Sequence, residues 1–194
     1  LLKYKGWRGP VVRNLATTHM LDRVAESFGE KCYEVPVGFK YISAKMQETG
    51  AIIGGESSGG LTVRGHICGK DGIYAAALLV EMIAVSNKKL SQIARDIRRE
   101  YGSFYMEERD YRFTPEEKER IRCILLEEKK LPELPFETER VSYMDGCKVY
   151  FKNGGWVIAR FSGTEPLLRV FCEMKNQEDA VRICHLFEKY LGCS

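Results

Sequence analysis

The sequence lacks the residue patterns that mark several classes of protein. No two of its seven cysteines have Cys-x-x-Cys spacing, and three histidines are too few to assemble a zinc-binding pattern. The longest apolar run is far shorter than the roughly 20 residues that span a bilayer. Residues 1–10 do not have the charged-then-apolar pattern of a signal peptide. We therefore expect a cytoplasmic protein of a reducing compartment, with no membrane segment and no metal site in this chain.

The charge of the sequence is small and unevenly distributed. The net charge of +3 divides into +5 over residues 1–103 and −2 over residues 104–194. Neither half has the dense basic stripe that nucleic-acid binding usually needs, whereas a mildly basic first half suits a small anionic ligand. Hydrophobic residues make up 44% of the 194 residues, as in an ordinary globular protein. At roughly 100–200 residues per domain, this length allows one large domain or two small ones.

Short strand and helix patterns alternate through the first half of the chain. The predicted strands and helices follow one another in the order 11–16, 20–27, 32–35, 41–48 and 51–53. Asp71 then begins an apolar helix over residues 72–86, which we expect to be well buried, and Ser91 caps another helix. This alternation predicts a three-layer α/β domain with a largely parallel sheet over residues 1–103.

The pattern changes near residue 103. Thr114 is followed by proline and two acidic residues, which is typical of a helix start, and this helix is predicted to run to about residue 128. Residues 177–191 have the spacing of a closing helix. Asp145-Gly146 is a hairpin signal between strands. Strands are predicted over residues 104–113, 140–144, 148–152, 156–161 and 168–174. We therefore predict a small α+β domain over residues 104–194, built on an antiparallel sheet with two helices.

A segment between the last two predicted strands holds the most informative polar residues. These residues are Arg160, Ser162, Gly163, Thr164 and Arg169. The glycine lets backbone amides approach a ligand, the hydroxyls donate hydrogen bonds, and a guanidinium group pairs well with a phosphate. The alternative is an ordinary Ser-Gly-Thr turn with solvated arginines, and composition alone leaves both interpretations open.

A second group of polar residues lies on a glycine-rich loop, residues 54–60. Glu56 and Ser58 place a carboxylate and a hydroxyl two residues apart, a spacing that suits the neighbouring hydroxyls of a sugar. The alternative is a flexible loop with a solvated carboxylate. Lys40 follows a glycine at a predicted helix start, where it either meets an anion or lies on the surface. His66 lies on a loop and either exchanges protons near neutral pH or is structural.

Taken together, these segments resemble the α-D-phosphohexomutase superfamily, and within it the phosphoglucomutase/phosphomannomutase branch. Residues 160–166, Arg-Phe-Ser-Gly-Thr-Glu-Pro, are similar to the phosphate-binding loop of the fourth domain of these enzymes. The segments that resemble the third domain are Ala16–His19, Val37–Lys40, Gly54–Gly60, Gly65–Ile67 and Lys70–Gly72. Their order and spacing match from end to end, so the resemblance covers nearly the whole chain.

The resemblance implies a reversible transfer of a phosphoryl group between the 1- and 6-positions of a hexose phosphate. A hexose 1,6-bisphosphate intermediate turns around within a cleft between four domains. By this similarity Glu56 and Ser58 bind sugar hydroxyls, and Lys40 lies near the sugar or the transferred phosphoryl group. The phosphate that is not transferred is bound by Arg160, Ser162, Gly163 and Thr164, with Arg169 as a weaker candidate.

Two parts of the family's machinery do not occur in this sequence. The resemblance implies a phosphorylated serine in a Ser-His-Asn-Pro loop and Mg²⁺ on an Asp-x-Asp-x-Asp-Arg loop, and neither string is present. Gly60 stands where some members carry a histidine, which leaves proton transfer to His66 or Lys40 as auxiliary candidates. We expect the C-terminal two domains of a mutase, inactive without the N-terminal domains of the same protein. The alternative is a stand-alone, non-catalytic phosphosugar-binding module.

Overall fold

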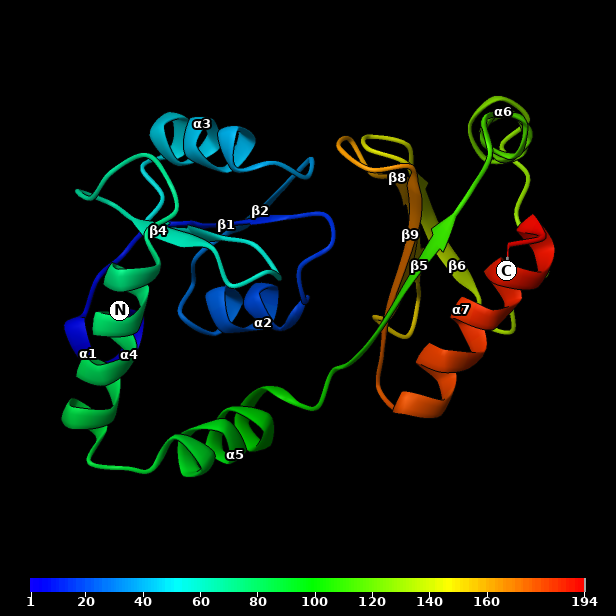
Figure 1. The fold of residues 1–194 in the computed structure, drawn as a ribbon. Helices are drawn as coiled ribbons and strands as arrows, with labels where there is room; N and C mark the ends of the chain where they lie inside the picture. The colour runs from blue at the N-terminus through cyan, green and yellow to red at the C-terminus, as the bar shows by residue number, and fades with distance from the viewer. Residues whose placement is uncertain (194) are drawn as a thin grey trace. The chain divides into compact units, whose positions relative to one another are not determined.

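The computed structural model describes residues 1–193 and divides the chain into two compact units (Figure 1). The first unit comprises Leu1–Ser103, and the second begins at Phe104. Within residues 1–193, no helix combines the length and the apolar character needed to cross a membrane.

The first unit contains a mixed β-sheet. Its strands lie in the order β2 (Cys32–Val35), β1 (Val11–Asn14), β3 (Ile53–Gly55) and β4 (Leu61–Val63). Strand β1 is parallel to β2 and β3, whereas β4 is antiparallel to β3. The sequence patterns did not predict β4. Because β4 pairs with β3, the glycine-rich loop is the turn of a β3–β4 hairpin rather than a simple connection.

Helices cover both faces of this sheet, as Figure 1 shows. Helix α3 (Phe39–Thr49) lies on one face and α2 (Met20–Ser27) on the other. The α3 side is closed by a cluster of apolar residues, Val12, Val35, Ile42, Met46 and Ala51. The predicted three-layer α/β architecture is therefore confirmed.

Helix α4 (Gly72–Ser86) is not buried, and the prediction that it would be was wrong. The structure describes every residue of α4, and none is buried: Ile73 is 87% exposed and Val80 is 65% exposed. Helix α1 (Leu2–Lys5) touches α4 through an ion pair of 2.7 Å between Lys5 and Glu81. The prediction relied on the apolar composition of α4. An apolar helix favours packing against a partner surface, but its composition does not show which part of a protein provides that surface.

Helix α5 (Leu90–Tyr101) follows α4. Its cap residue is Lys89, whose amide donates to Gln92 Oε1 at 2.8 Å, so Ser91 is not its cap as predicted. Helix α5 contacts α2.

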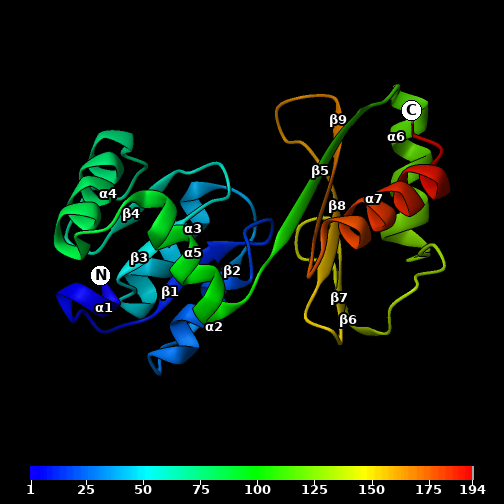
Figure 2. The same ribbon diagram turned by 90° about the horizontal axis from the view of Figure 1, so that it is seen from below.

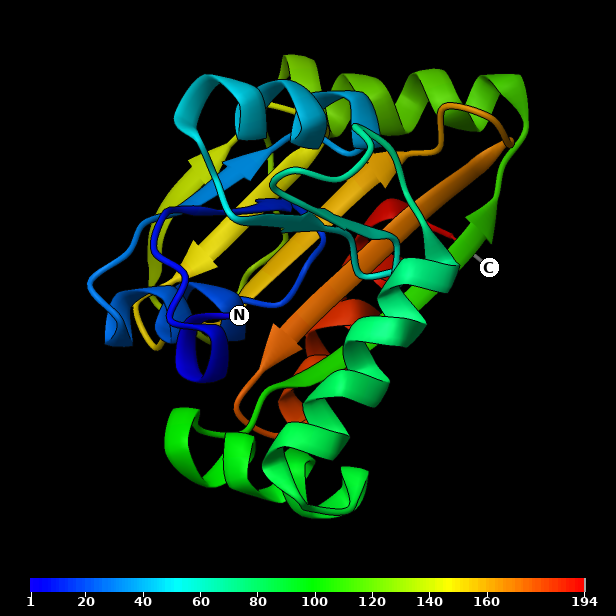
Figure 3. The same ribbon diagram turned by 90° about the vertical axis from the view of Figure 1, so that its left-hand side faces the viewer.

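The second unit contains an antiparallel sheet with helices on one face. Its strands lie in the order β5 (Tyr105–Arg112), β9 (Leu167–Met174), β8 (Trp156–Phe161), β7 (Cys147–Phe151) and β6 (Thr138–Ser142). Figure 3 shows β8 and β9 pointing in opposite directions. Helices α6 (Pro115–Arg122) and α7 (Gln177–Leu191) lie on the same side of this sheet in Figure 2. The predicted α+β class of the second half is confirmed.

The helix that begins after Thr114 changes its character before it ends. Thr114 and Glu117 form the capping box that the sequence suggests, with the Thr114 amide donating to the Glu117 carboxylate at 2.7 Å. The α-helix ends at Arg122, and a π-helical turn over Cys123–Glu127 replaces the α-helix predicted to continue to residue 128.

Candidate functional site

The candidate residues form two groups, one in each unit. In the first unit Glu56 and Ser58 lie at the carboxyl edge of the parallel strands, where ligand sites of open α/β sheets usually lie. Arg13 of β1 is in register with Gly55 of β3, so Asn14 and Glu56 follow their strands at the same edge. In the second unit they lie at the turn between β8 and β9.

Glu56 has a backbone fixed by the turn and a carboxylate held by two side chains. The Glu56 amide donates to the Gly60 carbonyl at 2.9 Å, and the Gly59 amide donates to the Glu56 carbonyl at 3.0 Å. Asn14 Nδ2 donates to Glu56 Oε1 at 3.2 Å, and Lys70 Nζ lies 3.2 Å from Glu56 Oε2. The Glu56 side chain is only 8% exposed, so its carboxylate is oriented in advance rather than free in solvent.

A second set of hydrogen bonds ties the glycine loop to the end of β1. Asn14 Oδ1 accepts from Thr17 Oγ1 at 2.8 Å and from the Ala16 amide at 3.0 Å. Thr17 Oγ1 in turn accepts from the Ser57 amide at 3.0 Å. Asn14 and Thr17 are both buried, whereas Ser58 lies exposed at the tip of the loop. The network therefore holds the base of the loop and leaves the Ser58 hydroxyl accessible.

Gly60 leaves the space through which Lys70 reaches Glu56. A Cβ atom at residue 60 would lie 2.2 Å from Lys70 Cδ, so any side chain there would displace the lysine. Neither Asn14 nor Lys70 was predicted from the sequence as a site residue. The available signals were the position of Asn14 at the end of a predicted strand and the absence of a side chain at Gly60.

His66 and Lys40 have different surroundings. His66 Nε2 lies 2.9 Å from Asp71 Oδ2, and its ring stacks on Tyr74 with the ring centres 4.1 Å apart. Asp71 also accepts from the Tyr74 amide, and this hydrogen bond together with His66 lowers the pKa of Asp71. His66 thus contributes to the start of α4. Lys40 is exposed in the first turn of α3, with Nζ 4.9 Å from the centre of the Tyr41 ring.

In the second unit, the turn between β8 and β9 is organised by Ser162. Its amide donates to the Leu167 carbonyl at 2.8 Å, and its hydroxyl accepts from the amides of Thr164 at 3.4 Å and Glu165 at 3.3 Å. Gly163 has an ordinary φ, and a Cβ built there meets no atom within 4 Å. The fold itself therefore does not require glycine at residue 163. Because no atom lies within 4 Å of the built Cβ, this side of the turn is open to solvent.

Arg160 and Arg169 lie directly opposite each other on β8 and β9. Like charges in this arrangement repel, because cross-strand neighbours have Cβ atoms only about 5 Å apart. The Nε atoms of both arginines are buried and have no hydrogen-bond partner among residues 1–193. Buried donors without partners are rare and costly. An anion bound by the outer nitrogens of this pair would offset the repulsion.

Carboxylates of the described residues lie near both arginines, but none of them accepts a hydrogen bond from the Nε atoms. Asp145 Oδ2 is 3.3 Å from Arg160 Nε, a charge contact whose angles do not make a hydrogen bond. Glu165 Oε2 is 2.6 Å from Arg169 Nη2, and Asp110 Oδ1 is 3.7 Å from Arg169 Nε. Arg160 is thus the less constrained of the two, although its side chain is only 11% exposed.

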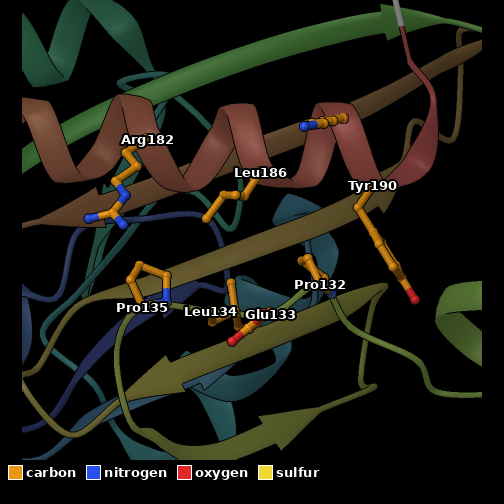
Figure 4. A pocket seen from close by; sticks show the side chains of 8 residues that line it. Pro132, Glu133, Leu134, Pro135, Arg182, Leu186 and Tyr190 are labelled. Atoms are coloured by element: carbon orange, nitrogen blue, oxygen red, sulfur yellow. The ribbon is translucent and has the colours of Figure 1, made fainter.

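The described part of the chain also holds a pocket away from these two groups. Its volume is about 660 Å³, and it lies in the second unit, where Arg182, Leu186 and Tyr190 of α7 face the segment 132–135 (Figure 4). This pocket contains none of the candidate residues. Among residues 1–193, no group of three or more His, Cys, Asp or Glu side chains is arranged to hold a metal ion.

Models of protein families match most of the chain. A model described as "Phosphoglucomutase/phosphomannomutase, alpha/beta/alpha domain III" matches residues 1–101. A second model, described as "Phosphoglucomutase/phosphomannomutase, C-terminal domain", matches residues 121–189.

The chain is also similar to individual proteins with these names. The chain is 31% identical over 185 residues to a phosphoglucomutase/phosphomannomutase of Thermococcus kodakarensis, covering 94% of the chain and 38% of the relative. It is 30% identical over 168 residues to a phosphoglucosamine mutase of Solibacter usitatus, covering 87% and 33%. A crystal structure of a Thermus thermophilus protein assigned as a phosphomannomutase superposes with a TM-score of 0.76 at 27% identity, covering 97% and 37%. The chain thus spans little more than a third of the length of these proteins.

Proposed function

Because the chain belongs to the phosphoglucomutase/phosphomannomutase family, we propose that it supplies the sugar- and phosphate-binding residues of a phosphohexomutase. Such an enzyme interconverts a hexose 1-phosphate and a hexose 6-phosphate. The observation that carries the proposal is the pair of like-charged arginines, Arg160 and Arg169, which lie opposite each other on β8 and β9 beside an open turn. The relatives named as phosphoglucomutase, phosphomannomutase and phosphoglucosamine mutase support the substrate class.

The two groups of residues have complementary tasks in this proposal. Arg160 and Arg169, with the Ser162–Thr164 turn, bind the phosphate that is not being transferred. Glu56 and Ser58 bind sugar hydroxyls, which a hexose presents in either orientation within the site. A ligand that must bind both ways round needs one clamp for its distal phosphate and one for its ring. Binding energy at the distal phosphate then orients the reacting end.

We propose that the two lysines near the sugar site interact with negatively charged groups. Lys70 pairs with the Glu56 carboxylate, which accepts hydrogen bonds from hydroxyls. Lys40 lies near the sugar or the transferred phosphoryl group and provides an exposed cation for it. His66 has its Nε2 2.9 Å from Asp71 Oδ2, at the start of α4.

The remaining chemistry belongs to a longer polypeptide. The chain spans 38% of the length of its Thermococcus relative, which leaves room for a phosphorylated serine and for Mg²⁺ outside residues 1–193. The described residues include no group of side chains that fits a metal site. The hexose 1,6-bisphosphate intermediate would form and turn around only when the preceding domains complete the site.

Turnover tests this proposal. The 194-residue chain alone is expected to convert no glucose 1-phosphate to glucose 6-phosphate, measured with a coupled dehydrogenase in the presence of magnesium and glucose 1,6-bisphosphate. A polypeptide that also carries the preceding domains is expected to be active. Turnover by the chain alone would contradict the proposal that the phosphorylated serine and Mg²⁺ lie outside this chain. An inactive longer polypeptide that still binds glucose 1-phosphate would support the non-catalytic binding module instead.

The exposed face of α4 suggests where the preceding domains bind. Ile73, Ala77, Val80 and Ala84 recur at the spacing of one helical face and are all exposed. Exposed apolar surfaces of this kind mark interaction sites. The Lys5–Glu81 ion pair holds the start of the chain against α4, so a preceding domain would be tethered beside this face. We propose that the face packs against that domain.

Val80→Asp should therefore affect the longer polypeptide and spare the chain. We expect a clear drop in the melting temperature and activity of the longer polypeptide, because the aspartate would be buried in the domain contact. The melting temperature of the 194-residue chain should change little, since Val80 is 65% exposed. Tyr105→Asp, at an exposed residue of the second unit away from the Arg160 turn, is the control. Equal effects of Val80→Asp in both polypeptides would contradict this docking surface.

A further inference from the structure

The turn between β6 and β7 approaches β8 unusually closely at Arg160. Gly146 has a φ of +85°, and a Cβ built on it would lie 2.5 Å from the Ala159 carbonyl oxygen and 2.6 Å from Arg160 Cβ. The first of these contacts is with backbone, so a rotamer change cannot relieve it. Both the backbone conformation and the space thus require glycine at residue 146. The Asp145-Gly146 pair, predicted only as a hairpin signal, therefore sets how closely this turn approaches Arg160.

The same turn brings a carboxylate to one edge of the Arg160 guanidinium. Asp145 Oδ2 lies 3.3 Å from Arg160 Nε, and the two side chains are 25% and 11% exposed. This Nε atom has no hydrogen-bond partner among the described residues, so Asp145 is the charge that faces it. A guanidinium group is planar and presents its donors in a fixed fork. A contact at its Nε edge consequently restricts the direction of the outer nitrogens.

The arrangement across the sheet shows that Asp145 serves Arg160 rather than Arg169. In register across β5, β9 and β8, the neighbours are Asp110, Arg169 and Arg160. Strand β7 lies on the other side of β8, and Cys147 is in register with Ala159, so the turn before Cys147 comes level with Arg160. Arg169 has its own carboxylates, Glu165 and Asp110. Each arginine therefore has an acidic neighbour of its own.

We propose that Asp145 is a positioning residue for Arg160, and that Gly146 is the glycine that permits it. The carboxylate holds the Nε edge of the guanidinium and directs its outer nitrogens to the phosphate. This inference rests on the proposed phosphate-binding role of Arg160. It leads to an unusual expectation, because Asp145 is a negative charge beside an anion site. Simple electrostatic repulsion predicts that its removal strengthens phosphate binding, whereas positioning predicts that its removal weakens it.

The experiment measures the affinity of the 194-residue chain for inorganic phosphate and for glucose 1-phosphate by NMR titration. Asp145→Asn should weaken the binding of both ligands about tenfold, the loss typical of one contact to a charged group. Asp145→Glu should restore part of it. Glu139→Gln removes a carboxylate from an exposed position on the same hairpin and should change nothing. The dispersion of the amide spectrum shows whether each variant is folded.

A double-mutant cycle separates positioning from a general structural effect. Once Arg160→Lys has removed the guanidinium, Asp145→Asn should have little further effect on affinity, because the two residues act through one contact. Additive losses would show that Asp145 acts elsewhere and would overturn the inference. Unchanged or tighter binding by Asp145→Asn alone would also overturn it, while leaving the phosphate role of Arg160 intact. Failure of the wild-type chain to bind either ligand would contradict the proposed phosphate site itself.

Discussion

Arg160→Ala is expected to lower kcat/KM of the longer, active polypeptide for glucose 1-phosphate by about 100- to 1,000-fold. Hydrogen bonds to charged groups contribute roughly 1.5–3 kcal/mol each, and a guanidinium group makes two with a phosphate. The lower part of that range, about 3–4 kcal/mol in total, corresponds to this loss. The Arg160 side chain is 11% exposed, so water replaces the missing donors poorly.

Arg182→Ala is the matched control for this variant. Arg182 belongs to the same unit but lines the pocket beside α7, so its removal should leave kcat/KM unchanged. A melting temperature for each variant separates loss of binding from loss of folding. If folded Arg160→Ala loses less than about threefold in kcat/KM, a shift below 1 kcal/mol, Arg160 does not bind a phosphate of the substrate.

Glu56→Ala is expected to have the second largest effect, a loss of about 100-fold in kcat/KM. The carboxylate is held by Asn14 and Lys70, so it is oriented before a sugar arrives. Its removal deletes charge-assisted hydrogen bonds to hydroxyls, worth roughly 1.5–3 kcal/mol each. It also leaves the Asn14 amide, which is buried, without its acceptor.

Glu56→Gln separates orientation from charge. The glutamine oxygen can still accept from Asn14, but the ion pair with Lys70 is lost, so we expect an intermediate loss of about tenfold. Glu48→Gln is the control, because Glu48 is an exposed residue paired with Lys45 on α3. Equal activity of Glu56→Gln and the wild type would show that the negative charge of Glu56 is not needed.

Local sequence signals located most of the elements. The closing helix was predicted over residues 177–191, which are its bounds in the structure. In the structure Asn176 caps its start and Gly192 follows its end. Strand β4 was missed because three residues after a glycine-rich loop carry too little periodicity. Helix α4 was expected to be buried but is exposed. Its burial depends on whether another part of the chain packs against it, which a short stretch of sequence does not show.

The candidate site was predicted only in part, for a similar reason. Glu56 and the Arg160–Thr164 segment were proposed because their residue types stand next to one another in the sequence and because their segments resemble the family's loops. Asn14 and Lys70 were not found, since their contacts with Glu56 depend on the parallel pairing of β1 with β3 and on the space above Gly60. Asp145 was likewise noted only as part of a turn. Its contact with Arg160 depends on the pairing of β7 with β8.

The central claim is that this chain carries separate binding groups for a phosphate and for a sugar. An NMR titration of the isotope-labelled 194-residue chain with glucose 1-phosphate, and with inorganic phosphate alone, tests it most directly. The account predicts saturable shifts at the amides of Ser162, Gly163 and Thr164 with both ligands. It predicts shifts at Glu56 and Ser58 with the sugar phosphate only. Shifts confined to other parts of the chain, such as the pocket beside α7, would contradict it.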